Sequence, residues 1–285
     1  MKIDYKKERQ ILKKIITTNE ISSLININNT TIKDITVLGI GGSHIYKANC
    51  KNLNIEKYTF YEIDEGNFFE NIQNFIKEEK EFNTIFSYPF IPKKNNGYID
   101  AFFKNNTVIS KKLPFKKEDF LLSYKLNRLT NIVNDACASN LFNIYTNKGY
   151  EIYLSLLSGT GINISYSQNN SPINTEFGNI KIPKESDLLQ IPGVESYENI
   201  LSFDSIQKSP LDLKSAKDLS AHIFSLSAIS LIEDYKSASL IFQGSFITKD
   251  KEYSLMIEKY IKQYFKGNIN IIIDNFSDIK GASLI

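Results

Sequence analysis

The chain has 285 residues, long enough for two domains that each bury a hydrophobic core. A hydrophobic content of 42%, with 12% aromatic residues, indicates a globular protein rather than a disordered one. The 34 basic and 32 acidic residues give a net charge of +2, which provides no electrostatic case for nucleic-acid binding, and no apolar stretch reaches the length of a membrane span.

The cysteine content and the N-terminal segment indicate the compartment. Cys50 and Cys137 are too few for a disulfide framework or for a four-cysteine zinc site. The first residues spread charges among their apolar positions and have no small-residue cleavage site, so they do not form a signal peptide. We therefore expect a cytoplasmic protein with reduced thiols.

Residues 1–33 are predicted to be an N-terminal helical extension. Leu12, Ile15 and Ile16 fall on one face of a helix over residues 3–18, and lysines fill the other faces. Such a basic amphipathic helix can contact a membrane, but docking on its own domain is the favoured interpretation. The segment is short for a DNA-binding winged helix.

A smaller domain is expected over residues 34–146, joined by the C-terminal segment 270–285. Its predicted elements are strands at 35–40, 45–50 and 57–63, a helix at 68–76, a strand ending at Pro89, strands at 98–103 and 107–110, and a short helix after Pro114. Gly41, Gly42 and Ser43 form the tip of the first hairpin, where glycines allow positive φ and a close backbone approach.

The stretch 130–142, TNIVNDACASNLF, closes this first group of elements. It predicts a strand that delivers Asn134 and Asp135 to the start of a helix. A carboxylate at this place either caps the first turn or lies at the mouth of a cleft as a general base. Both interpretations stay open on local grounds.

The second domain, 147–269, repeats this architecture without a strict sequence repeat. Its predicted elements are strands at 150–157, 162–166 and 178–182, a helix at 211–233, a strand at 239–242 and a helix at 253–265, followed by a strand at 270–273. The order predicts an α/β protein with two ribonuclease-H-like domains, each a mixed sheet flanked by helices, and a cleft between them.

Two glycine turns would face that cleft. Gly159, Thr160 and Gly161 form the second turn, and backbone N–H groups at such turns can bind phosphate oxygens. Two phosphate loops with Asp135 between them suit phosphoryl transfer from a nucleotide to an alcohol.

Seven short segments, in this order, resemble motifs of the bacterial glucokinases and the wider ROK (repressor–kinase) sugar kinases, in the actin/hexokinase/Hsp70 ATPase superfamily. They are LGIGGSH, TNIVNDACASNLF, LLSGTGINISY, TEFGNIKIP, VESYENILS, LIFQGSF and IIIDNFSDIKGASLI. The resemblance covers nearly everything after Lys33.

The resemblance implies an ATP- and Mg²⁺-dependent kinase that phosphorylates the 6-hydroxyl of a hexose such as glucose. Asp135 would be the base that takes the proton of that hydroxyl. The residues implied to bind the sugar are Asn106, Asn134, Glu176, Asn179 and Glu198. The residues implied to bind the nucleotide and its phosphates are Gly41, Gly42, Ser43, Gly159, Thr160, Gly161, Gly244 and Ser245. Mg²⁺ would be bound mainly through the nucleotide, with no metal ligands assigned in the chain.

Three departures from the family pattern define the alternatives. Gly39 stands where the family has the aspartate that organises the Mg²⁺ shell, Asn179 replaces a histidine, and Ser245 replaces a glycine. A sugar-binding pseudokinase, acting as a sensor, is therefore the alternative to an active kinase, and a DNA-binding regulator is the third. Relatives are often dimers, so a homodimer stays open, and the sequence does not identify the sugar.

Overall fold

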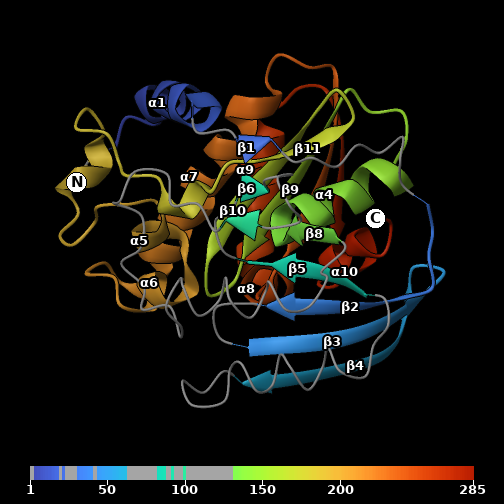
Figure 1. Cartoon of the computed structure of the whole chain (residues 1–285). Helices are drawn as coiled ribbons and strands as arrows, with labels where there is room; N and C mark the ends of the chain where they lie inside the picture. Colours follow the sequence, from blue (N-terminus) through green and yellow to red (C-terminus); the bar gives the residue numbers. More distant parts are fainter. Residues whose placement is uncertain are drawn as a thin grey trace.

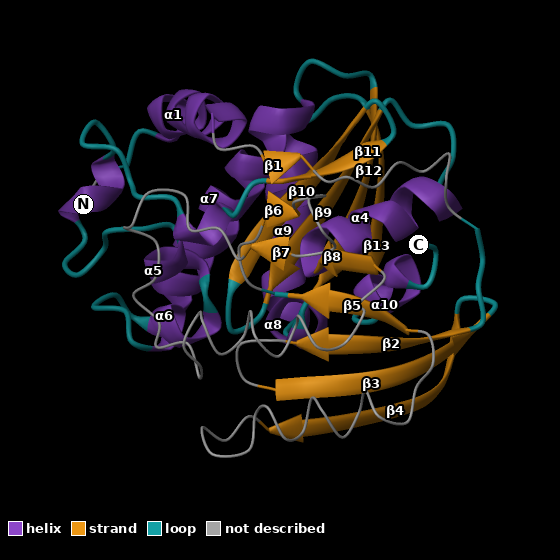
Figure 2. Cartoon of the chain, viewed as in Figure 1, coloured by secondary structure: helices purple, strands orange, loops and turns teal. Residues whose placement is uncertain are grey.

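The computed structural model describes residues 3–18, 21–22, 31–40, 44–62, 82–87, 91–92, 99–100 and 131–285. Within these residues the chain forms two mixed sheets with helices around them (Figures 1 and 2). Several predictions concern residues outside these ranges, namely the hairpin tip at 41–43, the helix at 68–76, most of the strand at 98–103, Asn106, the strand at 107–110 and the helix after Pro114.

The first sheet has five strands in the order β4-β3-β2-β5-β8. Their bounds are β2 (Ile35–Ile40), β3 (His44–Lys51), β4 (Asn54–Glu62), β5 (Phe82–Phe86) and β8 (Asn131–Asn134). β2, β3 and β4 form an antiparallel meander, whereas β5 pairs parallel with both β2 and β8. This is the mixed sheet that the sequence predicts. A separate short pair joins β6 (Ile91–Pro92) to β7 (Ile99–Asp100).

The second sheet has six strands in the order β1-β11-β10-β9-β12-β13. Their bounds are β1 (Ile21–Ser22), β9 (Ile152–Ser158), β10 (Ile162–Gln168), β11 (Ser171–Asn174), β12 (Ser237–Gln243) and β13 (Asn268–Ile273). β9, β10 and β11 are antiparallel neighbours, and β12 is parallel to both β9 and β13. Residues 270–273 therefore belong to this sheet and not to the five-stranded one.

The strand predicted at 178–182 is wrong. The return strand of the second meander is β11, directly after the hairpin turn at Asn169 and Asn170, which both have positive φ. Residues Phe177–Asn179 instead form the 3₁₀ turn η3. The physical reason lies just before it, because Glu176 adopts a left-handed conformation with φ of 49° and turns the chain away from the sheet.

Helices cover both faces of the six-stranded sheet. On one side, α7 (Leu213–Ile232) packs against α9 (Lys251–Tyr264). On the other side, α4 (Asp135–Thr146) contacts β9, β10, β11 and β12, and α10 (Ser277–Ala282) packs on α4. Because α10 also contacts β2, β3 and β5, the α4–α10 pair lies between the two sheets (Figure 1). The expected division into two domains at 146 stays a prediction.

The N-terminal helix α1 (Tyr5–Thr18) docks on α7, as expected. Leu12 and Ile16 are fully buried in the larger of two hydrophobic cores. Lys13 adds ion pairs with Glu233 and Asp234, each at 2.8 Å. Among the helices that the structure describes, none combines the length and apolar character that crossing a bilayer requires.

Candidate active site

The sequence left two roles open for Asp135, a helix cap or a general base, and in the structure Asn134 is the cap. Asn134 is the N-cap of α4, and its Oδ1 accepts hydrogen bonds from the backbone N–H groups of Ala136 and Cys137 at 3.0 and 3.3 Å. An asparagine in this extended conformation satisfies the helix end by itself. Asp135 is therefore not required as the cap, although its Oδ1 also accepts from Ala136 N at 2.7 Å.

Asp135 is a buried carboxylate, with 8% of the residue exposed. Burial raises the pKa of Asp135 to about 6, and the Ser87 hydroxyl and the Ala136 N–H act in the opposite direction. A carboxylate that titrates close to neutral pH is suited to general base chemistry.

Glu176 is held by two asparagine side chains. Its Oε1 accepts from Asn174 Nδ2 at 2.6 Å, and its Oε2 accepts from Asn179 Nδ2 at 3.2 Å. Burial first, and then the negative charges of Asp135 and Glu198, raise the pKa of Glu176 to about 7, against the opposing effect of the two asparagine hydrogen bonds. The three carboxylates therefore lie near one another, although they come from three different elements.

Asn163 connects the two sides of this group and was not among the residues predicted from the sequence. Its Nδ2 donates to Asn174 Oδ1 at 2.9 Å and approaches Asn134 Oδ1 at 3.5 Å, while its Oδ1 accepts from Phe177 N at 3.3 Å. The available signal was a buried asparagine in the apolar strand that follows the second glycine turn. This network fixes the amide of Asn134 relative to the loop that carries Glu176.

The predicted sugar and phosphate segments meet at Gly161. A side chain on Gly161 would begin 3.8 Å from Glu198 Oε1. Glu198 is the first residue of the short helix α5 (Glu198–Leu201). The glycine turn itself is closed by a hydrogen bond from Gly159 N to Gly161 O at 3.0 Å.

The predicted adenosine turn lies against the same glycine turn. Gly244 has a φ of 99°, and a Cβ there would lie 2.4 Å from Ser158 O, so this close approach requires glycine. A Cβ on Gly159 would lie 3.6 Å from Ser245 N, the first residue of α8 (Ser245–Lys249). Two adjacent glycine turns with backbone N–H groups fit the phosphates of a nucleotide.

An aromatic ring fills the space beside Gly39, where the resemblance led us to expect an aspartate. A Cβ on Gly39 would lie 1.9 Å from the ring of Tyr46 on the neighbouring strand. The Tyr46 hydroxyl donates to Asp278 Oδ2 at 2.8 Å. Burial, and to a smaller extent the charge of Asp135, raises the pKa of Asp278 to about 7. Tyr46 and Asp278 were not among the residues predicted from the sequence.

These side chains do not make a dedicated metal site. Among the described residues, no group of three or more histidine, cysteine, aspartate or glutamate residues is arranged to hold a metal ion.

The predicted residues thus fall into two groups. The structure brings together Asn134, Asp135, Glu176, Asn179, Glu198, Gly159, Gly161, Gly244 and Ser245 through the contacts above, and Thr160 lies within the same turn. Gly41, Gly42, Ser43 and Asn106 lie outside the described residues, so their roles stay predictions.

The chain resembles known proteins in its fold but not in its sequence. No family model and no curated protein sequence matches the chain. Among solved structures, a ROK family glucokinase from Streptomyces griseus in complex with glucose and AMPPNP is 13% identical, with a TM-score of 0.62 over 87% of this chain and 97% of that chain. A hexokinase from Schistosoma mansoni complexed with glucose is 11% identical, with a TM-score of 0.65 over 98% of this chain and 95% of that chain.

A ROK family transcriptional regulator, a homolog of the E. coli MLC protein, also matches. It is 13% identical, with a TM-score of 0.58 over 88% of this chain and 76% of that chain. These likenesses confirm the predicted fold, the two-domain α/β actin-like ATPase fold of ROK sugar kinases and hexokinases. The fold itself does not assign a reaction, because similar folds carry different functions.

Proposed function

We propose that this chain, which has the fold of the ROK sugar kinases and hexokinases, is an ATP-dependent sugar kinase. It would transfer the γ-phosphate of ATP to the 6-hydroxyl of a hexose such as glucose. The observation that carries the proposal is the group of three neighbouring carboxylates, Asp135, Glu176 and Glu198, beside the glycine turn at 159–161. The S. griseus glucokinase was solved with a sugar and an ATP analogue, which supports both substrate classes.

Asp135 is assigned as the general base. Its carboxylate takes the proton of the sugar hydroxyl as the oxygen forms a bond to phosphorus and the bond to the leaving ADP breaks. Burial places the pKa of Asp135 at about 6, so the group is mostly ionised at pH 7.5 and can accept that proton. A base positioned in this way contributes on the order of 10²- to 10⁴-fold to the rate.

The neighbouring groups would orient the sugar. Glu176 and Glu198 accept hydrogen bonds from ring hydroxyls, and the amides of Asn134 and Asn179 add donors. Asn163 contacts both Asn134 Oδ1 and Phe177 N, so it would hold Asn134 in a fixed position relative to Glu176. Buried and mutually hydrogen-bonded polar groups of this kind discriminate strongly against molecules that lack the matching hydroxyl.

The glycine turns would hold the nucleotide. The turn at 159–161 would lie against its phosphates, with the Gly159 N–H kept in the bond to Gly161 O that closes the turn, and Gly244 with Ser245 would face the adenosine. Mg²⁺ bound to the phosphates would neutralise their charge.

A sugar-binding pseudokinase is the second candidate, and Gly39 favours it. The Tyr46 ring fills the space where the family has a metal-organising aspartate. A chain of this kind would keep the pocket around Glu176 while transferring phosphate slowly or not at all. The two candidates share the sugar site and differ only in turnover.

The test combines binding with turnover. Purified protein is incubated with Mg-ATP and glucose, mannose or N-acetylglucosamine, and the sugar phosphate is identified by mass spectrometry. We expect a sugar 6-phosphate from the wild-type chain and about 10²-fold less or none from Asp135→Asn. Calorimetry on Asp135→Asn, which keeps the shape of the side chain, should show retained sugar binding.

The outcomes separate the candidates. Sugar binding without turnover on any sugar would assign the chain as a pseudokinase. Turnover that survives Asp135→Asn would remove the assigned base. Absence of binding to every sugar in the panel would overturn both candidates.

A further inference from the structure

Glu176 and Glu198 lie at the two ends of one excursion of the chain, residues 177–197. The excursion is closed at its neck, where Ile182 N donates to Glu195 O at 2.9 Å and Lys181 pairs with Ser196 in an isolated antiparallel bridge. The two carboxylates therefore flank a single folded loop, which we call the sugar loop. Whatever fixes this loop also fixes the backbone at both of its ends.

Two buried rings join the ends of the sugar loop. Phe177 follows Glu176, Tyr197 precedes Glu198, and the ring centroids of Phe177 and Tyr197 are 4.8 Å apart in a stacked arrangement. Both rings are fully buried. Stacking between the neighbours of the two carboxylates makes their relative position depend on how the loop packs.

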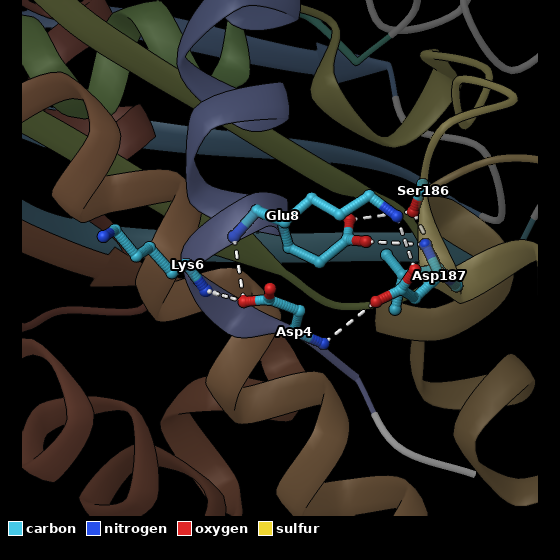
Figure 3. Close-up of polar contacts among 7 residues, drawn as sticks. Asp4, Lys6, Glu8, Ser186 and Asp187 are labelled. Carbon is cyan, nitrogen blue, oxygen red and sulfur yellow. Dashed lines mark hydrogen bonds and ion pairs between the residues drawn. The ribbon is translucent and has the colours of Figure 1, made fainter.

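Glu8 of the N-terminal helix holds the far side of the sugar loop (Figure 3). Its Oε2 accepts from Ser186 Oγ at 2.8 Å, and its Oε1 accepts from Asp187 N at 2.7 Å. Ser186 Oγ in turn accepts from Leu188 N at 3.1 Å and caps the 3₁₀ turn η4 (Asp187–Gln190). One side chain of α1 thus fixes both the cap and the first residue of this turn.

In a second set of bonds, groups at the start of α1 donate to the carboxylate of Asp187 in the sugar loop. Asp187 Oδ2 accepts from Asp4 N at 2.9 Å, and Asp187 Oδ1 pairs with Lys7 Nζ at 2.6 Å. Asp4 Oδ1 accepts from the backbone N–H groups of Lys6 and Lys7 at the start of α1. The start of the helix and the sugar loop therefore satisfy one another's backbone groups.

Glu8 is more than an anchor for α1. Leu12 and Ile16 already bury the apolar face of the helix on the core, and Lys13 is ion-paired at the far end. The Glu8 carboxylate is 0% exposed, and the cost of burying it is offset by the hydrogen bonds that it accepts from Ser186 and Asp187 of the sugar loop. The charge of Glu8, after burial itself, also raises the pKa of Tyr197, which places Glu8 close to the ring beside Glu198.

We propose that Glu8 is a positioning residue of the sugar site: it holds the sugar loop in the conformation that presents Glu176 and Glu198. The helix α1 would then be part of the binding site and not an appended segment. The identity of the ligand rests on the proposed function, whereas the coupling of Glu8 to the loop does not.

The first experiment measures the coupling by amide hydrogen exchange on the full-length chain. Glu8→Ala removes both acceptors and should speed exchange about tenfold or more in peptides covering 177–197, with no change in peptides from α7. Ile16→Val is the matched control, because it lowers stability from the same helix by roughly 0.5–1.5 kcal/mol and removes none of the hydrogen bonds to the loop. We expect exchange in 177–197 to stay at the wild-type rate in that control.

The second experiment measures the consequence at the site by calorimetry with glucose, mannose and N-acetylglucosamine. Glu8→Ala should weaken sugar binding about tenfold or more, while Ile16→Val should leave it unchanged. Glu8→Gln should rescue most of the affinity, because its amide oxygen can still accept from Asp187 N and its amide NH₂ can donate to Ser186 Oγ. For an active kinase, KM for ATP should stay within about twofold of wild type in all three variants, since the nucleotide turns do not contact Glu8.

Unchanged exchange in 177–197 for Glu8→Ala overturns the positioning role. Faster exchange with unchanged sugar affinity overturns its link to the sugar site. A wild-type chain that binds none of the sugars overturns the proposed function, and the exchange measurement then still decides whether Glu8 positions the loop.

Discussion

The ring of Tyr46 occupies the space that a side chain on Gly39 would need, with its nearest carbon 1.9 Å from the position of a Cβ. The two residues face each other on neighbouring antiparallel strands of the five-stranded sheet. The absence of a side chain on Gly39 thus leaves the space that the large ring of Tyr46 occupies. Introducing an aspartate at position 39 is consequently not a single-residue change.

Gly39→Asp is expected to destabilise the chain unless Tyr46 is reduced as well. Overpacking of this kind costs about 1–3 kcal/mol, and Tyr46→Ala should relieve it. Urea denaturation of both single variants and the double variant gives the coupling free energy, which we expect to be favourable by at least about 1 kcal/mol. Gly39→Asp with Tyr46→Phe is the control: the ring remains, so the penalty should remain. Additive effects in the first pair would contradict the steric relationship.

Asp135→Asn should make the protein more stable at alkaline pH while removing its activity. The pKa of Asp135 is raised from 3.8 to about 6 by burial, so the folded state holds the proton more tightly than the unfolded state does. This contribution is fully present below pH 4 and is lost as the pH rises through about 6. A shift of two units corresponds to about 3 kcal/mol, so on the order of 1–3 kcal/mol should be regained by Asn at pH 8.

The measurement is the free energy of unfolding of the wild-type and Asp135→Asn chains at pH 4 and at pH 8. Equal stability at pH 4 and a more stable variant at pH 8 is the expected result. An Asn variant that is less stable at pH 8 would show that the ionised carboxylate is satisfied in the folded chain, contrary to its burial.

Sugar affinity should rise with pH, and Glu176 should be responsible for much of the change. Burial, then the charges of Asp135 and Glu198, raise the pKa of Glu176 to about 7, and only the ionised group accepts two hydroxyl hydrogen bonds. Calorimetry between pH 5.5 and 8 should show tighter binding toward pH 8. Glu176→Gln should bind at least about tenfold more weakly at pH 8 and show a flatter profile.

Glu195→Gln provides the matched control for that experiment. Glu195 lies in the same loop, but its side chain is exposed. Its substitution should change neither the affinity nor the pH profile. A profile for Glu176→Gln as steep as that of the wild-type chain would assign the pH dependence to another group.

The sequence predicted those parts of the site that local chemistry determines. Asn134 before a helical stripe predicts a capped helix start, and the structure has one. The glycine turn before 162 predicts a meander, which β9 and β10 form. In both cases the residues that determine the local structure are neighbours in the chain, so the folded protein keeps the conformation that they prefer.

The remaining parts depend on residues far apart in the sequence. Tyr46 and Asp278 are separated by 232 positions, and Glu8 and Ser186 by 178. Nothing local in either segment indicates its partner. The strand wrongly expected at 178–182 failed for a similar reason, because the backbone after Glu176 bonds to the side chain of Asn163 on another strand.

Gly244→Ala should impair nucleotide binding and leave sugar binding intact. A Cβ at this position would lie 2.4 Å from Ser158 O, so the turn at 244–245 must move away from the glycine turn at 159–161. We expect KM for ATP to rise about tenfold or more, since the turn that faces the adenosine would no longer lie against the turn that faces the phosphates. For a chain without turnover, the same loss should appear in the calorimetric affinity for the non-hydrolysable analogue AMPPNP.

Gly149→Ala separates this effect from backbone strain. Gly149 has a φ of 101°, close to the 99° of Gly244, but nothing lies within 4 Å of its Cβ position. Both alanines must adopt an unfavourable backbone conformation, at a cost of about 1–2 kcal/mol of stability. Only Gly244→Ala also pushes against a neighbouring turn. Equal nucleotide affinities in the two variants would mean that the contact between Gly244 and Ser158 does not shape the nucleotide site, and the assignment of 244–245 to adenosine would have to be withdrawn.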